Sequence, residues 1–350
     1  MTTMTVLGAG MMGSALCVPL VDRGHRVRLV GTHLDDAIIH SLRSTRVHPK
    51  LDLELPTGIE PYPFDEVDRA MQGVEILGVG VSSAGVHWAS AQLARYARPE
   101  VPIVMITKGL ELDEAGRLRP LPDALRAGLN AESGPPLHPA AVAGPCIAGE
   151  LARRVPTCVV LTGRDAAVLE RLAAELRTSY YHVWTSADMV GVEVCAALKN
   201  AYAMGIAFAL GLHDKQGGVA GSVAMHNYES AVFAQSVVEM QRLVTRLGGS
   251  AETVAALAGV GDLDVTCNGG RTGRFGRLLG LGLSPSAAAE RMAGATLECL
   301  DILRVTRDAV GSLEQRGVLR SDELPLLRHL WQVALEGAPV AVPFERFFAD

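Results

Sequence analysis

The stretch TVLGAGMMGSALCVPLV, residues 5–21, decides the fold expected for the first half of the chain. A short apolar strand runs into a glycine-rich turn, and an apolar helical segment follows at once. In this context Gly8 permits a tight turn, Gly10 lets a pyrophosphate approach the backbone, and Gly13 lets the helix pack on the strand. The free N–H groups at the start of such a helix bind phosphate. The turn that we expect to hold a dinucleotide consists of Gly8, Ala9, Gly10, Met11, Met12 and Gly13.

Short apolar strands alternate with helical segments as far as residue 185, and only long helical segments follow. This pattern predicts an α/β fold, in which a doubly wound, mainly parallel sheet is followed by an all-helical C-terminal domain. We expect a dinucleotide-binding domain over 1–185 and a helical substrate-binding domain over 186–350. The Pro-rich segment 53–64 is predicted to be a connection, and the Gly-rich segment 213–222 a surface loop.

Composition excludes several classes of protein. The 350 residues include 32 Lys and Arg against 38 Asp and Glu, a net charge of −6, and no block of basic residues argues for nucleic acid or an anionic membrane as a partner. The six cysteines are scattered without CxxC spacing, which favours reduced thiols in the cytoplasm over disulfides or a metal site. Segment 194–212 is long enough to span a membrane. Because Lys199 and Asn200 lie near its middle, we expect a buried core helix instead.

Lys199 is the strongest candidate for chemistry. It is the one charged residue in the nineteen-residue segment 194–212, whose other residues are apolar or small. Its ammonium group therefore needs to face a cleft or a carboxylate. Partial desolvation lowers the pKa of a lysine toward neutrality, which suits a general acid or base, and the neighbouring Asn200 can hydrogen-bond a hydroxyl or carbonyl group. The alternative is a lysine that extends to the wet side of its helix.

Three further segments carry polar groups next to glycines. Segment 260–276 is read as a Gly-rich loop whose hydroxyl and guanidinium groups suit a phosphate-bearing ligand, or as a long surface loop. Lys108, in TKGLE, follows a predicted strand at the ligand-binding edge of the sheet. Segment 143–150, AGPCIAGE, is a Gly-Pro turn at another strand end. For the last two, an ordinary turn is the alternative.

The residues after the second predicted strand bear on the choice of cofactor. An NAD-selective site usually has Asp or Glu at the end of this strand, and here Gly31, Thr32 and His33 occupy the place. A 2′-phosphate is therefore not obviously repelled. Thr32 and His33 are candidates for contact with the ribose or its phosphate, and a solvated loop histidine is the alternative for His33. The sequence leaves NAD and NADP both open.

Taken in order, these segments resemble the cytosolic NAD(P)-dependent glycerol-3-phosphate dehydrogenase family over nearly the whole chain. The resemblance implies a Rossmann-type domain followed by an all-helical substrate domain, commonly in a homodimer. It also implies interconversion of dihydroxyacetone phosphate and glycerol 3-phosphate with NAD or NADP. The matching segments are GAGMMG (8–13), VSSAGV (81–86), TKGLE (107–111), AGPCIAGELARRVPT (143–157), GVEVCAALKNAYAMGIA (191–207), AGVGDLDVTC (258–267) and RTGRFG (271–276).

The resemblance also implies roles for individual residues. Lys199 matches the proton donor and acceptor, Asp262 the aspartate near it, and Lys108 a lysine that binds and orients substrate. Arg271 matches an arginine that holds the substrate phosphate and reaches the cofactor. The other implied substrate contacts are Asn200, Thr266 and Thr272, and the other implied cofactor contacts, besides the glycine turn, Lys108 and Arg271, are Thr32, His33, Ser82, Ala148 and Glu298.

Some positions depart from the family pattern. Thr272 stands where Asn is usual, Gly149 stands where a lysine is usual, and segment 213–226 is longer than usual. Gly273 also stands in place of a further arginine, and Glu229 and Gln235 stand where arginines are common, so the positive charge expected near the substrate falls. Another polyol or sugar phosphate is therefore an alternative substrate, and a 3-hydroxyacid or 6-phosphogluconate-type dehydrogenase is the enzymatic rival. A dinucleotide-sensing protein that has lost turnover is the non-enzymatic rival.

Overall fold

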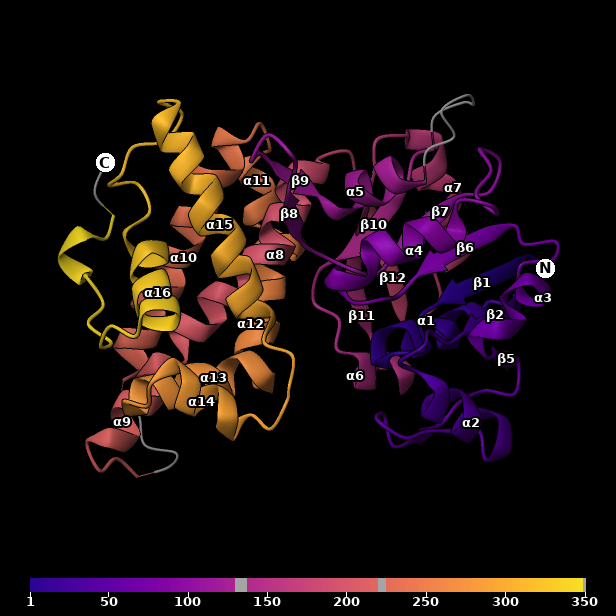
Figure 1. Ribbon diagram of the computed structural model, residues 1–350, viewed down its shortest axis with the longest axis horizontal. Coiled ribbons are helices and arrows are strands. Elements are labelled where there is room, and N and C mark those ends of the chain that lie inside the picture. Colours follow the sequence, from indigo (N-terminus) through magenta and orange to yellow (C-terminus); the bar gives the residue numbers. More distant parts are fainter. Residues whose placement is uncertain (130–136, 220–224, 349–350) are drawn as a thin grey trace. The chain divides into compact units, whose positions relative to one another are not determined.

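A computed structural model describes residues 1–129, 137–219 and 225–348 (Figure 1). The chain divides into two compact units, each described here by itself. The first unit contains Met1–Lys108 and Pro120–Met189, and the second contains Gly109–Arg119 and Val190–Asp350. Residues 109–119, which lie in the first half of the sequence, thus belong to the second unit. The functional division expected at 185/186 stays a prediction.

The first unit is built on an eight-stranded sheet with the lateral order β5-β2-β1-β6-β7-β10-β11-β12. All neighbouring strands are parallel except β10 and β11, which pair antiparallel. The doubly wound, mainly parallel sheet expected from the alternating pattern is therefore confirmed. Its strands are β1 (Thr3–Leu7), β2 (Arg26–Val30), β5 (Ile59–Tyr62), β6 (Ile76–Val79), β7 (Ile103–Met105), β10 (Ala140–Ala143), β11 (Thr157–Thr162) and β12 (Tyr181–Ser186).

The order of the strands creates a switch point beside β1. The chain winds outward to β2 and β5 on one side, then returns to place β6, β7 and β10 on the other. Leu7, the last residue of β1, pairs with Val30 of β2 and with Val79 of β6, so these three parallel strands end together. In open α/β sheets, ligands bind at the carboxyl ends of the strands at this switch point.

Helices cover both faces of the sheet (Figure 1). Alternate residues of each strand point to opposite faces, so Val6 joins one buried apolar cluster and Leu7 the other. The first cluster takes in α1 (Met11–Asp22), α2 (Asp36–Ser44), α6 (Ala148–Ala152) and α7 (Ala166–Leu176). The second takes in α3 (Val67–Ala70), α4 (Val86–Leu93) and α5 (Leu121–Gly128). Short elements of this unit are β3 (Val47–His48), β4 (Leu53–Glu54), η1 (Phe64–Glu66) and η2 (Ser83–Gly85).

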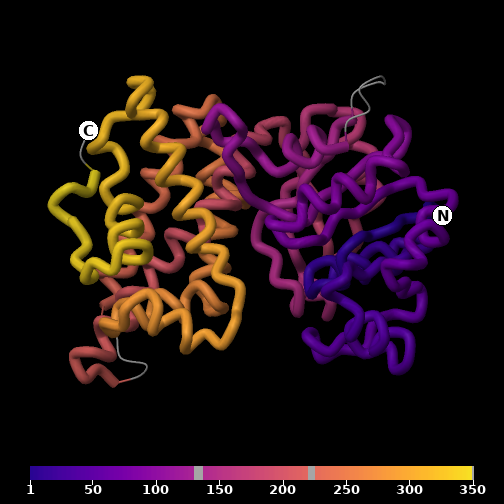
Figure 2. The backbone as a smooth tube through the Cα atoms, in the orientation of Figure 1, coloured from indigo at the N-terminus to yellow at the C-terminus, as the bar shows by residue number. Residues whose placement is uncertain are grey.

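The described residues of the second unit are helical apart from one two-stranded sheet, and Figure 2 shows the helical path of its orange-to-yellow part. The small sheet pairs β8 (Leu110–Leu112) with β9 (Leu118–Pro120) and packs on α15. The helices are α8 (Met189–Ile206), α9 (Phe208–Lys215), α10 (His226–Arg246), α11 (Ala251–Val254), η3 (Leu257–Gly261), α12 (Asp262–Cys267), α13 (Gly270–Leu281), α14 (Pro285–Arg291), α15 (Glu298–Gln315), α16 (Pro325–Glu336) and η4 (Phe344–Arg346).

Helices α8 and α9 form the core of the second unit. In the part of the chain that the structure describes, the stretch Met189–Lys215 is long and apolar enough to cross a membrane, with a mean hydropathy of 1.4. However, 83% of its apolar window is buried inside the structure. Its apolar side chains are therefore covered by protein, which agrees with the core helix expected from the sequence.

Two predictions of irregular structure were wrong, and a third was wrong in part. Segment 53–64 contains β5, an edge strand that tolerates Pro61 because one of its sides has no neighbouring strand. Segment 260–276 is largely helical rather than a Gly-rich loop. Gly276 serves helix packing, whereas Gly269 and Gly270 have positive φ and a Cβ on Gly273 would meet no described atom within 4 Å. A Cβ on Gly276 of α13 would lie 2.2 Å from the carbonyl oxygen of Met204 in α8. The surface loop predicted at 213–222 is helical as far as Lys215, and residues 220–222 lie outside the described residues.

Candidate active site

The glycine turn after β1 has the shape that a pyrophosphate cradle requires. Gly8 has φ +109°, and a Cβ on it would lie 2.7 Å from the carbonyl carbon of Gly80. A Cβ on Gly13 would lie 2.1 Å from the Gly8 carbonyl oxygen, so this glycine lets α1 press against the turn. A Cβ on Gly10 would meet no described atom within 4 Å. The space beside Gly10, at the N-terminus of α1, therefore fits the phosphates of a dinucleotide.

Asp35, an acidic residue slightly beyond the end of the second strand, supports the glycine turn through hydrogen bonds. The carboxylate of Asp35 accepts hydrogen bonds from the backbone N–H of Ala9 at 3.2 Å, and from the N–H and hydroxyl of Thr32, both at 2.8 Å. Thr32 and Asp35 are both buried, whereas His33 is exposed and its ring lies 5.6 Å from that of Trp88. The Thr32 hydroxyl thus donates inward, and His33 is the more accessible of the two expected cofactor contacts.

The remaining expected residues of the first unit follow the carboxyl ends of other strands. Ser82 is exposed after β6, and Ala148 is the first residue of α6, which follows β10. Lys108 follows β7, is half-buried, and donates from Nζ to the carbonyl oxygen of Gly144 at 3.0 Å. Because the carboxyl ends of parallel strands share one edge, these residues and the glycine turn lie along the ligand-binding edge of the sheet.

The second unit brings Lys199 and Asp262 together in a buried ion pair. The Lys199 side chain is 13% exposed and that of Asp262 is 1% exposed, and Nζ donates to Oδ1 of the aspartate. Asp262 opens helix α12, where a carboxylate is favoured by the helix dipole. The tight turn before it depends on Gly259, since a Cβ there would lie 2.0 Å from the carbonyl oxygen of Val254. The Asp262 carboxylate is therefore the partner that the Lys199 ammonium group needs on an apolar helix.

Two other expected substrate contacts lie on the same helices as this pair, and a third lies on α13, the next helix along the chain. Asn200 is half-buried beside Lys199 on α8. Thr266 is half-buried one turn after Asp262, and its hydroxyl donates to the Asp262 carbonyl oxygen at 2.6 Å. Thr272 lies in the first turn of α13 and is buried. The hydroxyl of Thr266 keeps its acceptor capacity for a ligand, because its one proton is used within the helix.

Arg271 and Glu298, both expected near the cofactor, form an ion pair within the second unit. Nη2 of Arg271 lies 3.3 Å from Oε1 of Glu298, and the two side chains are 43% and 50% exposed. An exposed pair of this kind contributes little to stability, so both groups are available to a charged ligand. Among the described residues, no group of three or more His, Cys, Asp and Glu side chains has an arrangement that could hold a metal ion.

Sequence reasoning missed two fully buried glutamates of the second unit. Glu193, on α8 with Lys199, accepts a hydrogen bond at 3.0 Å from the backbone N–H of Gly109, the residue after Lys108. Glu239, on α10, accepts from Gln235 at 2.9 Å and from Tyr202 of α8 at 3.1 Å. It also accepts at 2.6 and 2.8 Å from the N–H groups of Leu326 and Leu327, which open α16. A charged residue within an apolar helical pattern is the signal that marks both.

Burial raises the pKa of the Glu239 carboxyl from 4.5 to about 7, although its hydrogen-bond donors oppose the shift. Between these values the folded protein keeps a proton that the unfolded chain has released. The contribution of this group to stability is therefore full below about pH 4.5 and is lost as the pH rises to about 7. We expect the free energy of unfolding of the wild type, relative to Glu239→Gln, to fall by up to about 3 kcal/mol over this range.

Urea unfolding at a series of pH values measures this difference. Glu336→Gln is the matched control, because it removes a carboxyl group that lies exposed at the end of α16, outside the buried cluster around Glu239. If the wild type instead gains stability over Glu239→Gln as the pH rises, the donors outweigh burial and keep the buried carboxylate ionised.

Comparison with known proteins decides the family. A family model described as the N-terminus of NAD-dependent glycerol-3-phosphate dehydrogenase matches residues 3–169, and one described as its C-terminus matches residues 188–345. The chain belongs to this family. This confirms the family resemblance that the glycine turn, the ALKN segment and the GVGDLDVTC segment indicate.

Curated relatives cover most of the chain. The NADP(+)-dependent glycerol-3-phosphate dehydrogenase of Archaeoglobus fulgidus is 35% identical over 291 residues, which is 82% of this chain and 83% of the relative. A glycerol-3-phosphate dehydrogenase of Pectobacterium carotovorum, named for NAD(P)+, is 32% identical over 95% of this chain and 91% of the relative. These relatives are similar to this family member from the glycine turn to the helical unit.

Solved structures agree with the fold of this family member. The crystal structure of glycerol-3-phosphate dehydrogenase from Coxiella burnetii has 27% sequence identity and a TM-score of 0.76, and the match covers 98% of this chain and 96% of that one. The glycerol-3-phosphate dehydrogenase of Plasmodium falciparum is 16% identical with a TM-score of 0.81 and covers 100% of this chain and 96% of that one. The second likeness supports the fold alone.

Proposed function

We propose that the protein is an NAD(P)-dependent dehydrogenase that interconverts dihydroxyacetone phosphate and glycerol 3-phosphate. The buried ion pair between Lys199 and Asp262 carries this proposal, because it gives a family member of this fold a positioned proton donor. The named activity of the curated relatives supports the substrate.

The residues of the first unit fit the cofactor. The bare backbone at Gly10 and the close contact at Gly13 leave room for a pyrophosphate, and the start of α1 supplies N–H groups to it. When bound, the reduced nicotinamide supplies the hydride that the carbonyl carbon of the substrate accepts. The two relatives described above are named for NADP(+) and NAD(P)+, which supports either dinucleotide.

In the reduction, the Lys199 ammonium group gives its proton to the oxygen on which negative charge develops. Asp262 holds the ammonium group in one orientation and stabilises its positive charge until the proton leaves. Asn200 and Thr266 offer an amide and a hydroxyl group to the substrate oxygens, and Lys108 contributes a further positive charge. In the oxidation the same lysine, as a neutral amine, takes the proton back.

The substrate phosphate is assigned to the start of α13, where Arg271 is exposed. Its guanidinium group can bind phosphate oxygens through two parallel hydrogen bonds. Thr272, which replaces the usual Asn, gives a hydroxyl in place of an amide at the next position. This difference favours testing other ketone phosphates beside dihydroxyacetone phosphate.

The test of the proposed function is the disappearance of reduced nicotinamide absorbance, with NADH and NADPH each tried against a panel of ketones. Dihydroxyacetone phosphate should give the highest kcat/KM, and unphosphorylated dihydroxyacetone a much lower one. Preference for a 3-keto acid or for 6-phosphogluconate in the reverse direction would contradict the proposal, and absence of turnover with every ketone would favour a nucleotide-sensing protein.

Replacing Arg271 with alanine should weaken the binding of the phosphate group specifically. Loss of a charge-assisted hydrogen-bond pair of about 1.5–3 kcal/mol predicts a KM for the phosphorylated substrate about 10- to 100-fold higher. The effect should vanish with unphosphorylated dihydroxyacetone. Arg274→Ala, which removes an exposed arginine one turn further along α13, is the matched control and should leave KM unchanged. Equal losses for both ketones would place Arg271 outside the phosphate site.

We propose further that residues 1–185 bind the nucleotide, that residues 186–350 bind the substrate, and that the enzyme is a cytoplasmic homodimer. The six free cysteines support a reducing compartment. The dimer comes from the family resemblance, and light scattering coupled to size-exclusion chromatography tests it through the mass in solution.

A further inference from the structure

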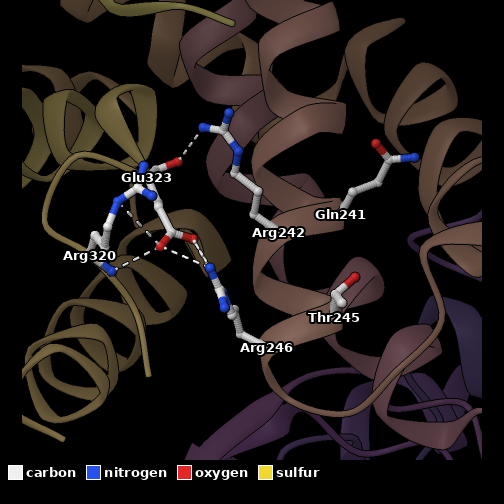
Figure 3. A pocket seen from close by; sticks show the side chains of 6 residues that line it. All are labelled: Gln241, Arg242, Thr245, Arg246, Arg320 and Glu323. Carbon is white, nitrogen blue, oxygen red and sulfur yellow. Dashed lines mark hydrogen bonds and ion pairs between the residues drawn. The ribbon is translucent and has the colours of Figure 1, made fainter. Parts of the chain in front are cut away.

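A cavity of about 420 Å³ opens on the second unit at residues that the proposed reaction does not use (Figure 3). It lies between the last turns of α10 and the segment that joins α15 to α16. Three arginines and one carboxylate line it, in a chain whose net charge is −6. Its lining residues are Gln241, Arg242, Thr245, Arg246, Arg320 and Glu323.

Glu323 holds two of the arginine side chains in place, Arg246 through its carboxylate and Arg242 through its carbonyl oxygen. The Glu323 side chain is 6% exposed and lies among the guanidinium groups, as Figure 3 shows. Nη2 of Arg246 donates to both of its oxygens, at 3.1 and 3.2 Å, and the backbone N–H of Arg320 donates to Oε1 at 3.0 Å. Nη1 of Arg242 donates to the Glu323 carbonyl oxygen at 2.9 Å.

This arrangement resembles a preorganised anion site more than a set of surface ion pairs. The side chains of Arg246 and Arg320 are 47% and 60% exposed, although one edge of Arg246 is fixed by the buried glutamate. An arginine that is already ordered loses less side-chain entropy when it binds a ligand. Glu323 and Asp322 together place two negative charges against the three guanidinium groups that line the cavity.

A second cavity, of about 300 Å³, adjoins the first and shares Arg246 with it. Arg117 and Arg316 also line it, and both are exposed. Asp113 pairs with Arg117 at 2.8 Å, and Asp322 hydrogen-bonds Arg320 at 3.0 Å. The pair with Asp322 is exposed on both sides and therefore weak, so a ligand with a higher charge can replace this aspartate. Asp113 is 16% exposed and also accepts from the backbone N–H groups of Ala115 and Arg117, so it stays in place beside Arg117. Each cavity thus has two arginines of its own besides the one that both share.

We propose that the two cavities form one binding site for a small polyanion with two phosphoryl groups, one for each cavity. Guanidinium groups bind phosphate oxygens through paired hydrogen bonds, which a compact ammonium group cannot do. The combined space is the size of an ordinary small-molecule site, and Gln241 and Thr245 supply neutral hydrogen-bonding groups for the organic part of the ligand.

Titration calorimetry with inorganic pyrophosphate tests the site in the full-length chain that carries Arg271→Ala, so that the substrate phosphate site is weakened. Pyrophosphate should bind, and orthophosphate should bind at least about tenfold more weakly because it reaches one cavity only. Arg242→Gln and Arg320→Gln should each raise the Kd for pyrophosphate by about tenfold. Arg316→Gln should weaken the binding of pyrophosphate but not the binding of orthophosphate.

Arg304→Gln is the matched control, because Arg304 is an exposed arginine of α15 that lines neither cavity. It should leave pyrophosphate affinity unchanged, and thermal unfolding of each variant checks that the helices are intact. Pyrophosphate binding that is absent, or unaffected by Arg242→Gln and Arg320→Gln, would overturn the proposal, as would equal affinities for orthophosphate and pyrophosphate. Separate titrations with ADP and with a hexose bisphosphate distinguish a nucleotide ligand from a sugar ligand. Because binding is the readout, this result is independent of turnover.

Discussion

Lys199→Met should lower kcat for dihydroxyacetone phosphate reduction by about 10²–10⁴-fold, the usual contribution of a general acid. The side chain keeps its length but cannot donate a proton to the developing alkoxide. The Kd for NADH or NADPH should stay close to the wild-type value, because the glycine turn and its supporting contacts lie in the first unit. Steady-state kinetics and fluorescence titration of the reduced cofactor measure the two quantities. Lys215→Met, which removes an exposed lysine of α9, should match the wild type in both.

The single variant also leaves Asp262 buried without its cation. A charge that is 1% exposed and has lost its partner costs about 3–5 kcal/mol of stability, so lost activity alone does not separate chemistry from folding. The double variant Lys199→Met, Asp262→Asn removes both charges and should regain much of that stability. It should remain inactive at a temperature where it is fully folded. Turnover in the folded double variant would mean that another group donates the proton.

The sequence predicted the order of the main elements because each strand and helix shows its own apolar pattern. It failed at β5, where Pro61 removes a donor that a central strand would need but an edge strand does not. It also failed at α13. Glycine lowers helix propensity, so segment 260–276 was read as a loop. The structure uses Gly276 for a close approach to α8, a tertiary contact that no local pattern encodes.

For a similar reason, the sequence pointed to some residues of the candidate site and not to others. The expectation that Lys199 needs a carboxylate followed from one charge in an apolar helix, and the family resemblance supplied Asp262 as the partner. Nothing local marks Asp35 as the group that accepts from the Ala9 N–H, since 26 residues separate them. The same holds for Glu239, whose donors come from α8, α10 and α16. Long-range hydrogen bonds to buried acids depend on packing, which the sequence specifies only through the complete fold.

Gly13→Ala should damage both the fold of the first unit and its affinity for the cofactor. The new Cβ would lie 2.1 Å from the Gly8 carbonyl oxygen, and backbone atoms cannot rotate away as a flexible side chain can. Helix α1 must therefore shift from β1, with an expected loss of about 1–3 kcal/mol in the free energy of unfolding. The shift also moves the helix N-terminus that binds phosphate, so we expect the Kd for NADH or NADPH to rise by about 100-fold or more.

Gly10→Ala separates the two effects, because a Cβ there meets no described atom within 4 Å. This variant should unfold like the wild type and yet bind the dinucleotide poorly, since the methyl group occupies the space through which the pyrophosphate approaches the backbone. Gly10 is the N-cap of α1 in extended conformation and lies outside the helix interior, so the alanine brings no gain in helix propensity that could hide a loss of stability. If Gly10→Ala binds both dinucleotides as tightly as the wild type, the phosphates do not lie at this turn.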